Sequence, residues 1–415
     1  MNRAPVSRLD LFFVYAAYAL RYLYLLVLIP FYGRVLGVEA YGQVLAGMSL
    51  MSMVWMFVSY GFPGVGGREM ALAPPAGYGV IFWRQWSGRA VFSLLALVGG
   101  GVAVWASPVL AATPWLGLWA VLLGLVSAYN IGWYFTGSHR PRQSVKLEVL
   151  GFVLNLVLIL SLVRSEADVN WTLGSILISG SIALAVAHWW VRGEIGKPRV
   201  SIGQGLQLIK GSSTFFVYSA SSALLVSSST YLLSLLSTSQ EVGHFGAAER
   251  LASVGLAVMG PAAQVFVPRI TALFAQDHAA AYRLVRKAAL LLLAVGFSGC
   301  VLASVLAPWG IPLIFGAGFE SSVPVLRLLA ILFPLNACIQ ILGMYVLVPL
   351  YKESALMRCA LAGAAVNILL ALFLGSHSGA MGMAVARVLG ECITAGLLIG
   401  LAWREGILNS IFRLK

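Results

Sequence analysis

The sequence predicts an all-α integral membrane protein with twelve transmembrane helices in two six-helix lobes. Sixty per cent of its 415 residues are hydrophobic and only 10% are charged, which is more apolar surface than a soluble core can bury. The apolar runs are continuous over about 20 residues, as in membrane helices, whereas barrel strands alternate over about 10 residues. Basic residues also collect on one side of the predicted membrane, as they do in multi-spanning helical proteins.

Continuous apolar runs, separated by short loops, define the twelve predicted helices in order. They are 11–32, 42–62, 89–107, 115–136, 147–163, 171–191, 213–236, 246–267, 288–308, 323–347, 356–374 and 380–402. The longest connections are 63–88, 192–212 and 268–287, and each contains arginine or lysine. The first run follows a basic N-terminus and resembles a signal peptide, but Arg21 interrupts it and no A-x-A site follows. We therefore predict an uncleaved first helix.

The distribution of the 27 lysines and arginines predicts the orientation. With both termini placed in the cytoplasm, 21 of them fall in cytoplasmic segments and only Arg34 and Arg164 fall in outside loops. The remaining four, Arg21, Arg250, Arg327 and Arg387, lie within predicted spans. This asymmetry supports both the span count and the cytoplasmic termini.

Three weak internal matches suggest a repeat. Residues 151–160 and 363–372 both read G-x-x-x-N followed by aliphatic residues, and the matches AYGQ/HFGA and REMA/RITA recur at nearly the same offset. Because each half would hold six helices, the repeat is parallel and its axis lies along the membrane normal. The predicted organisation is an N-lobe (1–191), a cytoplasmic linker (192–212) and a C-lobe (213–415), with the transport path expected between the lobes.

Charged residues inside apolar spans are costly and usually functional. Arg387 and Glu391 are four residues apart on one helical face, so the sequence predicts a mutual ion pair, serving as a structural lock or in ion coupling. Glu249 and Arg250 are adjacent and lie near the outer interface, which their charged ends can reach. Glu249 is a second candidate for ion coupling. Arg327 also lies close to the membrane surface in its predicted span. Four arginines less two glutamates give this set a formal charge of +2, which favours anions.

Arg21 is the deepest of these charges, in the middle of the first span. Its neighbours one turn away include Tyr18 and Tyr24 but no acidic residue. An arginine fork suits phosphate oxygens, and tyrosine faces suit sugar rings, so this set predicts a site for a sugar phosphate. The alternative is a carboxylate from another helix, for which Glu391 is available.

The seventh span is rich in serine. It contains Ser219, Ser221, Ser222, Ser227, Ser228, Ser229 and Ser234 together with Thr230. Small polar residues either allow helices to pack closely or line a wet path. We favour the lining role, with Ser222 and Ser229 as its representatives.

Motifs of enzymes and cofactor sites are not found in the sequence. It has no G-x-x-x-x-G-K-[ST], G-x-S-x-G or H-E-x-x-H, so we expect no nucleotide site, no catalytic residues, no metal and no cofactor. His188, Trp189 and Trp190 lie together at the end of the sixth span, where they suggest an interfacial aromatic belt.

Several segments resemble a known transporter group. They are IPFYGRVLGVEAYGQ (29–43), VSYGFPGVGGREMA (58–71), NIGWYFTGSHR (130–140), SQEVGHFGAAERLAS (239–253) and LIFGAGFESSVPVLRLLA (313–330). They are similar to the polysaccharide-transporter branch of the multidrug/oligosaccharidyl-lipid/polysaccharide exporter superfamily, and within it to Wzx-type O-antigen flippases. The resemblance extends over about residues 10–400.

The resemblance implies a flippase that moves undecaprenyl-diphosphate-linked oligosaccharide across the bacterial inner membrane by alternating access. It also implies a cationic cavity that includes Arg21 and Arg250, with helix 7 serines as its wall. The helix-12 residue Arg387, like Arg327, is less securely placed by the resemblance. Membrane lipid is an expected partner, polymerase and chain-length proteins of the same pathway are candidate partners, and nucleic acid is not expected.

Two other function classes remain open from the sequence. One is a cation-coupled multidrug exporter of the same superfamily, although that branch typically carries a carboxylate in helix 1 where this chain has Arg21. The other is a polysaccharide polymerase or ligase, which needs a sizeable periplasmic loop, whereas the predicted outside loops are no longer than about 15 residues.

Overall fold

The computed structural model is helical throughout the described residues. It describes the backbone of residues 8–412, and the side chains of residues 27–411 apart from 214–215, 217–228 and 264. The chain divides into two compact units, Met1–Leu235 and Leu236–Lys415. The lobe boundaries expected from the sequence stay a prediction. Helix α9 (Ile202–Leu236) covers the end of the predicted linker and the first span of the predicted C-lobe, and it falls almost wholly in the first unit here.

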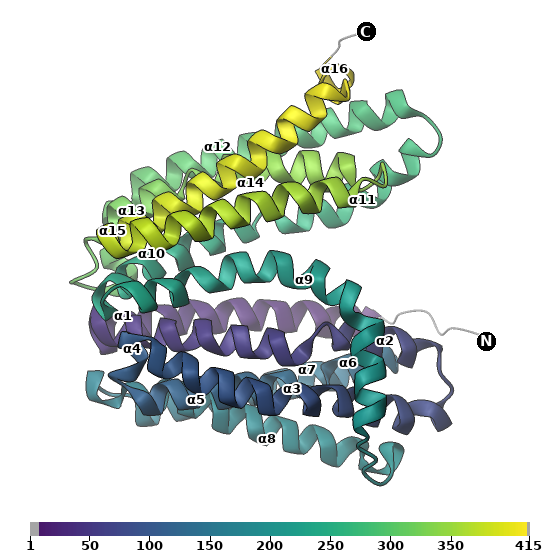
Figure 1. The fold of residues 1–415 in the computed structure, drawn as a ribbon, viewed down its shortest axis with the longest axis vertical. Coiled ribbons are helices and arrows are strands. Elements are labelled where there is room, and N and C mark those ends of the chain that lie inside the picture. The colour runs from purple at the N-terminus through teal and green to yellow at the C-terminus, as the bar shows by residue number, and fades with distance from the viewer. Residues whose placement is uncertain (1–7, 413–415) are drawn as a thin grey trace. The chain divides into compact units, whose positions relative to one another are not determined.

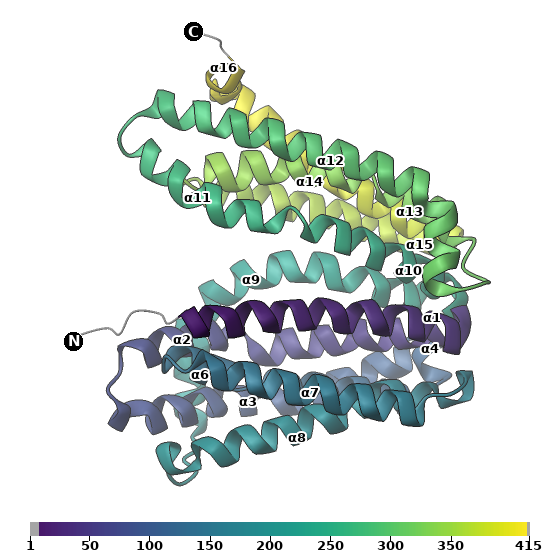
Figure 2. The same ribbon diagram turned by 180° about the vertical axis from the view of Figure 1, so that it is seen from behind.

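The first unit is a bundle of long apolar helices and short connecting helices (Figure 1). Its elements are α1 (Arg8–Ser59), α2 (Phe62–Leu72), η1 (Pro75–Gly77), α3 (Tyr78–Ala106), α4 (Pro108–Ala111), α5 (Pro114–Ala128), α6 (Gly132–Gly137), α7 (Pro141–Leu162), η2 (Glu166–Asp168), α8 (Val169–Ile195) and α9. Helix α5 packs against α1, α3 and α8, and α7 runs beside α8 (Figure 2). A Cβ atom on Gly124 would lie 2.7 Å from the carbonyl oxygen of Met51, so α1 and α5 approach backbone to backbone, as small residues allow in membranes.

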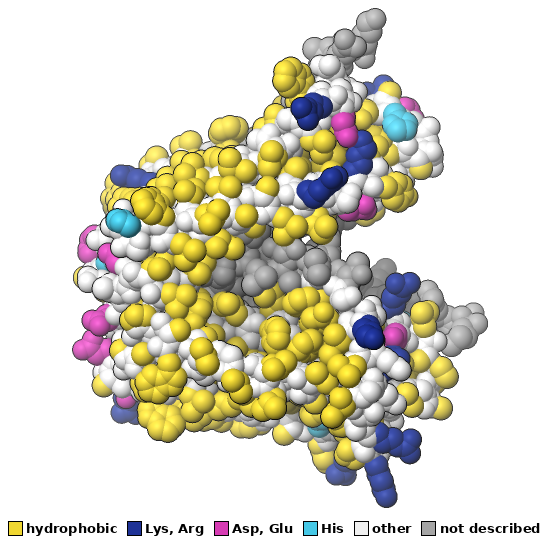
Figure 3. All heavy atoms as spheres, in the orientation of Figure 1, with side chains coloured by type: hydrophobic (Ala, Val, Ile, Leu, Met, Phe, Trp, Pro, Cys, Tyr) yellow, Lys and Arg dark blue, Asp and Glu magenta, His cyan; other side chains and the backbone are white. Residues whose placement is uncertain are grey.

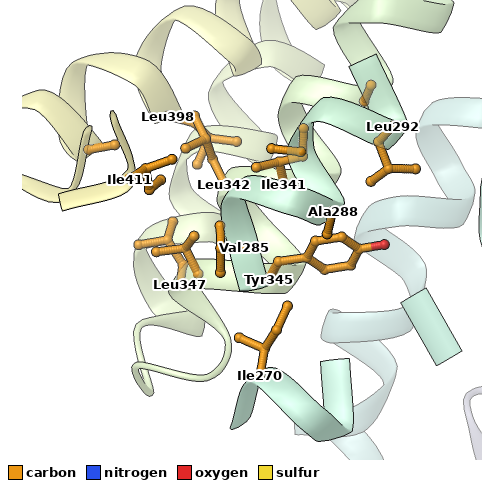
Figure 4. Packing of buried hydrophobic residues seen from close by; sticks show 14 of the residues in the cluster. Ile270, Val285, Ala288, Leu292, Ile341, Leu342, Tyr345, Leu347, Leu398 and Ile411 are labelled. Atoms are coloured by element: carbon orange, nitrogen blue, oxygen red, sulfur yellow. The ribbon is translucent and has the colours of Figure 1, made fainter. Parts of the chain in front are cut away.

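The second unit is built from fewer and longer elements. They are α10 (Ser239–Ala257), α11 (Gly260–Phe274), α12 (His278–Phe315), α13 (Ser322–Leu329), α14 (Leu332–Gln340), the π-helix η3 (Ile341–Leu347), α15 (Glu353–Arg404) and α16 (Ile407–Phe412). A core cluster forms where α11, α12, η3, α15 and α16 meet (Figure 4). Tyr345 and Leu347 of η3 and Val285 and Ala288 of α12 are all buried there. Apolar packing therefore holds the irregular π-helical turn in place.

Two helices each contain a pair of predicted spans. Helix α1 includes the predicted spans 11–32 and most of 42–62, and its backbone breaks at Gly37, where φ is 70°. Helix α15 includes 356–374 and 380–402, and breaks at Gly379, where φ is 51°. Positive φ is easily adopted only by glycine. The Glu241 carboxylate accepts a hydrogen bond from the Ala380 backbone N–H at 2.7 Å, so it caps the second half of α15 just after the break.

The helices do not correspond one to one with the predicted spans, because α1 and α15 each join two of them across a glycine break. Within the described residues, eight helices are long and apolar enough to cross a membrane, or nine if the bent pair α10–α11 is one span. The predicted span 246–267 is interrupted between α10 and α11, and 323–347 is divided among α13, α14 and η3. The all-helical membrane fold is confirmed, while the total of twelve stays a prediction.

The described surface has the pattern expected of a protein surrounded by lipid. Large apolar side chains such as Leu94, Val157, Phe297 and Leu369 are exposed along the helices. Figure 3 shows hydrophobic side chains along the sides of the helices in each unit, with lysine and arginine gathered mainly toward helix ends. This arrangement places charge where the headgroups and water lie.

Candidate functional site

Part of the predicted binding set lies outside the described side chains. Arg21, Tyr18, Tyr24 and Ser222 fall within residues 1–26 and 217–228, so their predicted roles stay predictions. The structure does describe Arg250, Ser229, Glu249, Arg387 and Glu391, and the site is built from these.

The central charged contact in the second unit joins α10 to α15. Nη1 of Arg387 lies 2.6 Å from Oε1 of Glu249, and the two side chains are only 7% and 15% exposed. This contact corrects the predicted pairing of Arg387 with Glu391. No ion pair between those two residues is found among the described side chains, because the guanidinium is drawn instead to a carboxylate 138 positions away in sequence.

Glu391 lies one turn beyond Arg387, where the two halves of α15 pack against each other. At this crossing a Cβ on Gly390 would lie 2.9 Å from the Gly363 carbonyl oxygen and 2.7 Å from the Asn367 Cβ. The crossing therefore requires glycine at position 390, and the next residue along the chain is the carboxylate Glu391. A buried carboxylate in such a tight place is either protonated or held by a nearby cation, and Arg387 is the nearest cation on the helix.

The described charges of this region balance formally. Arg250 is half-buried next to Glu249 on α10, so Arg250 and Arg387 together offset Glu249 and Glu391. Arg327 does not join them: it is exposed, and its Nε donates to the Ser304 carbonyl oxygen at 3.1 Å. Without the exposed Arg327, the described part of the predicted set carries no net formal charge, and the contribution of Arg21 stays a prediction.

The C-terminal end of the serine run is packed rather than wet. Ser229 is 2% exposed and Ser234 is fully buried. The Ser107 hydroxyl donates to the Ser234 carbonyl oxygen at 3.0 Å, and the Tyr231 backbone N–H donates to the Ser49 hydroxyl at 3.1 Å. These contacts tie α9 to α1 and to the turn between α3 and α4. They favour the packing role over the lining role for this end of the helix.

A partly open cavity of about 560 Å³ lies in the first unit; most of its wall is apolar, and it is called the polar cavity below for the asparagine, serine and glutamate side chains that line it. Its wall comes from α1, α5, α6, α7 and α8 and includes Trp55, Ser127, Asn130, Trp133, Ser144, Glu148, Phe152, Asn155 and Ser179. Asn155 is the asparagine of the repeated G-x-x-x-N pattern, so the sequence marked this position without revealing a cavity. Among the described residues of the wall, Glu148 supplies the one carboxylate.

Arg89 is a buried cation that the sequence placed among the cytoplasmic charges. It lies within α3 and is 1% exposed. Its Nε donates to the Ala128 carbonyl oxygen at 2.7 Å and its Nη1 to the Gln85 carbonyl oxygen at 3.0 Å. The guanidinium also lies 5.8 Å from the ring centroids of both Phe62 and Trp133. Carbonyl oxygens and aromatic faces, rather than water, therefore solvate this charge.

The residues of the predicted aromatic belt differ in their exposure. Trp189 is 60% exposed, as a belt residue should be. His188 instead faces inward: its Nδ1 lies 2.8 Å from the Leu184 carbonyl oxygen, and its ring packs against Phe82 and Trp86. The helical period separates neighbouring side chains by about 100°, which is why adjacent residues here have opposite surroundings.

Known proteins resemble this chain in both sequence and fold. Two curated relatives, each described as “Putative O-antigen transporter”, come from Escherichia coli (strain K12) and Shigella dysenteriae. The first is 23% identical over 96% of this chain and 97% of its own length, and the second is 22% identical over 92% and 96%.

The solved structure titled “Lipid II flippase MurJ, inward closed conformation” has a TM-score of 0.69 at 12% identity, covering 98% of this chain and 90% of its own. The structure of the MATE multidrug transporter DinF-BH has a TM-score of 0.55 at 17% identity, covering 94% and 93%. These likenesses show the fold.

The resemblance seen in the sequence is confirmed by these matches. A family model described as “Polysaccharide biosynthesis protein” matches residues 10–274, well over half of the chain. The chain therefore belongs to this family of polysaccharide biosynthesis proteins.

Proposed function

We propose that the protein is a flippase for undecaprenyl-diphosphate-linked oligosaccharide, such as an O-antigen repeat unit. The observation that carries the proposal is the end-to-end match to relatives described as O-antigen transporters. The cargo moves from the cytoplasmic to the periplasmic leaflet of the bacterial inner membrane, and both termini of the chain are cytoplasmic. Membrane lipid surrounds the protein, and polymerase and chain-length proteins of the same pathway are its candidate partners.

The physical task is to carry a charged, hydrated headgroup across hydrocarbon. A diphosphate carries a charge of about −2, and unpaired charge in a low-dielectric medium is strongly disfavoured. In the proposed mechanism Arg21 and Arg250 compensate the diphosphate while the polyprenyl tail stays in lipid. The N-lobe (1–191) and C-lobe (213–415) alternate access around the headgroup, and the segment 192–212 links them.

The contacts of the buried charges on α10 and α15 give the arginines different roles. Arg387 is already paired with Glu249, so it holds structure rather than cargo. Arg250 is partly offset by the same acidic set, and Arg21 then carries most of the compensation. Glu391 is the residue best placed to change its protonation during the cycle, because the Arg387 ion pair is with Glu249 instead.

Genetic complementation tests the proposal. Deleting the gene in its host should abolish surface polysaccharide and cause lipid-linked repeat units to accumulate in the inner leaflet, and the wild-type gene should reverse both effects. Unchanged surface polysaccharide together with altered sensitivity to cationic drugs would identify the multidrug-exporter alternative. A purified chain that transferred sugars would identify a polymerase or ligase.

A further inference from the structure

We propose that a groove between α7 and α8 binds the headgroup of an anionic phospholipid. The groove has a volume of about 490 Å³ and is lined by Gln143, Lys146, Trp189, Trp190, Arg192 and Gly193. It lies at the helix ends predicted to be cytoplasmic, within the first unit. It shares no lining residue with the polar cavity of that unit, and the inference does not depend on which cargo the protein moves.

The lining of the groove is positively charged. Lys146 and Arg192 contribute two cations, and no carboxylate belongs to the described wall. Glu194, the acidic residue closest to Arg192 in sequence, is engaged elsewhere: it accepts from Arg140 at 2.6 and 2.7 Å and from the Tyr134 hydroxyl at 2.5 Å. The Arg140–Glu194 contact also raises the pKa of Arg140, so that pair is firmly ionised. The charge of the groove is therefore left for an external anion.

Tryptophan places the groove at the membrane interface. Trp189 is 60% exposed, and the Arg192 guanidinium lies 5.6 Å from the centroid of its ring. Tryptophan collects at the headgroup level of bilayers, and the ring holds the guanidinium there by a cation–π contact. A phosphate at this depth is the natural counterion, and basic pockets between transmembrane helices commonly bind lipid headgroups.

Apolar stripes continue from the groove along both helices. On α7, Val153, Val157 and Leu160 are exposed, and they lie 7, 11 and 14 residues after Lys146 on the same helical face. On α8, Ile182 and Ile178 are exposed and lie 7 and 11 residues before Trp189. A headgroup held in the groove would therefore have its acyl chains beside apolar side chains, which favours a lipid over free phosphate.

Native mass spectrometry of the detergent-purified full chain tests this site. Dioleoylphosphatidylglycerol should be retained by the wild type and raise its thermal unfolding midpoint, while dioleoylphosphatidylethanolamine should do neither. The K146Q/R192Q variant should bind phosphatidylglycerol about 30-fold more weakly, as expected for two lost lipid-facing cations. The control K197Q/R199Q removes the same charge from exposed neighbours outside the groove and should behave as wild type.

Loss of lipid binding can be distinguished from unfolding of the variant, because the substituted side chains lie at the surface of the groove. The single variants K146Q and R192Q can be measured as well. Equal phosphatidylglycerol retention by K146Q/R192Q and the control would overturn the site. Inorganic phosphate that stabilises the protein as much as the lipid does would overturn its assignment to lipid.

Discussion

Replacing Arg387 with alanine is expected to destabilise the second unit by about 3–5 kcal/mol in free energy of unfolding. The guanidinium is 7% exposed and lies 2.6 Å from Glu249, so its removal leaves a buried carboxylate without its cation. Glu391, one turn away, also loses its nearest positive charge. Such a loss should lower the thermal unfolding midpoint by about 10 °C, measured by circular dichroism in detergent.

A double-mutant cycle separates the ion pair from general damage to α15. The single variants R387M and E249L should each be nearly as harmful as R387A, whereas the double variant R387M/E249L removes both charges and should recover much of the stability. Arg404 lies exposed in the last turn of the same helix, so R404A serves as the matched control and should stay within about 0.5 kcal/mol of wild type. Additive losses in the double variant would show that the two residues do not stabilise each other.

Substituting Arg21 should have the largest effect on transport. Arg250 and Arg387 are offset by Glu249 and Glu391 in the second unit, so the proposed compensation of the diphosphate depends chiefly on this residue. R21A is expected to reduce the appearance of surface polysaccharide at least tenfold, since one charge-assisted contact to a phosphate corresponds to about 1.5–3 kcal/mol. R21K keeps the charge but loses the planar fork, and should give an intermediate result.

The control for Arg21 is an arginine outside the apolar spans. Arg164 is exposed in the turn after α7, and R164A should complement fully at an equal membrane level of protein. Full complementation by R21A, with normal amounts of surface polysaccharide, would remove Arg21 from the proposed mechanism.

Composition and hydrophobic runs were sufficient to predict the helical membrane fold. They predicted most helix positions as well, because about 20 continuous apolar residues have few alternatives to a membrane helix. They did not predict that the breaks within α1 and α15 are single-residue kinks at Gly37 and Gly379 rather than loops. A glycine between two apolar runs is compatible with either a loop or a sharp turn, and only the backbone torsion angles distinguish the two.

The charged contacts were harder to predict, because they depend on which helices become neighbours. The i, i+4 spacing suggested Arg387 with Glu391, yet the partner comes from α10. The sequence does not mark Arg89 as buried, because it stands at the first position of the predicted span 89–107, while the carbonyl oxygens and aromatic rings that surround it come largely from other parts of the chain. The polar cavity and the basic groove are likewise assembled from several helices, so no local pattern marks them.

Translocation by the purified protein tests the central claim most directly. The protein is reconstituted into liposomes with its lipid-linked oligosaccharide, and the fraction of headgroups that reacts with a membrane-impermeant sugar-specific reagent is followed over time. We predict that wild-type protein makes inner-leaflet headgroups accessible from outside, and that R21A does so at least tenfold more slowly. An accessible fraction identical to that of protein-free liposomes would contradict the account.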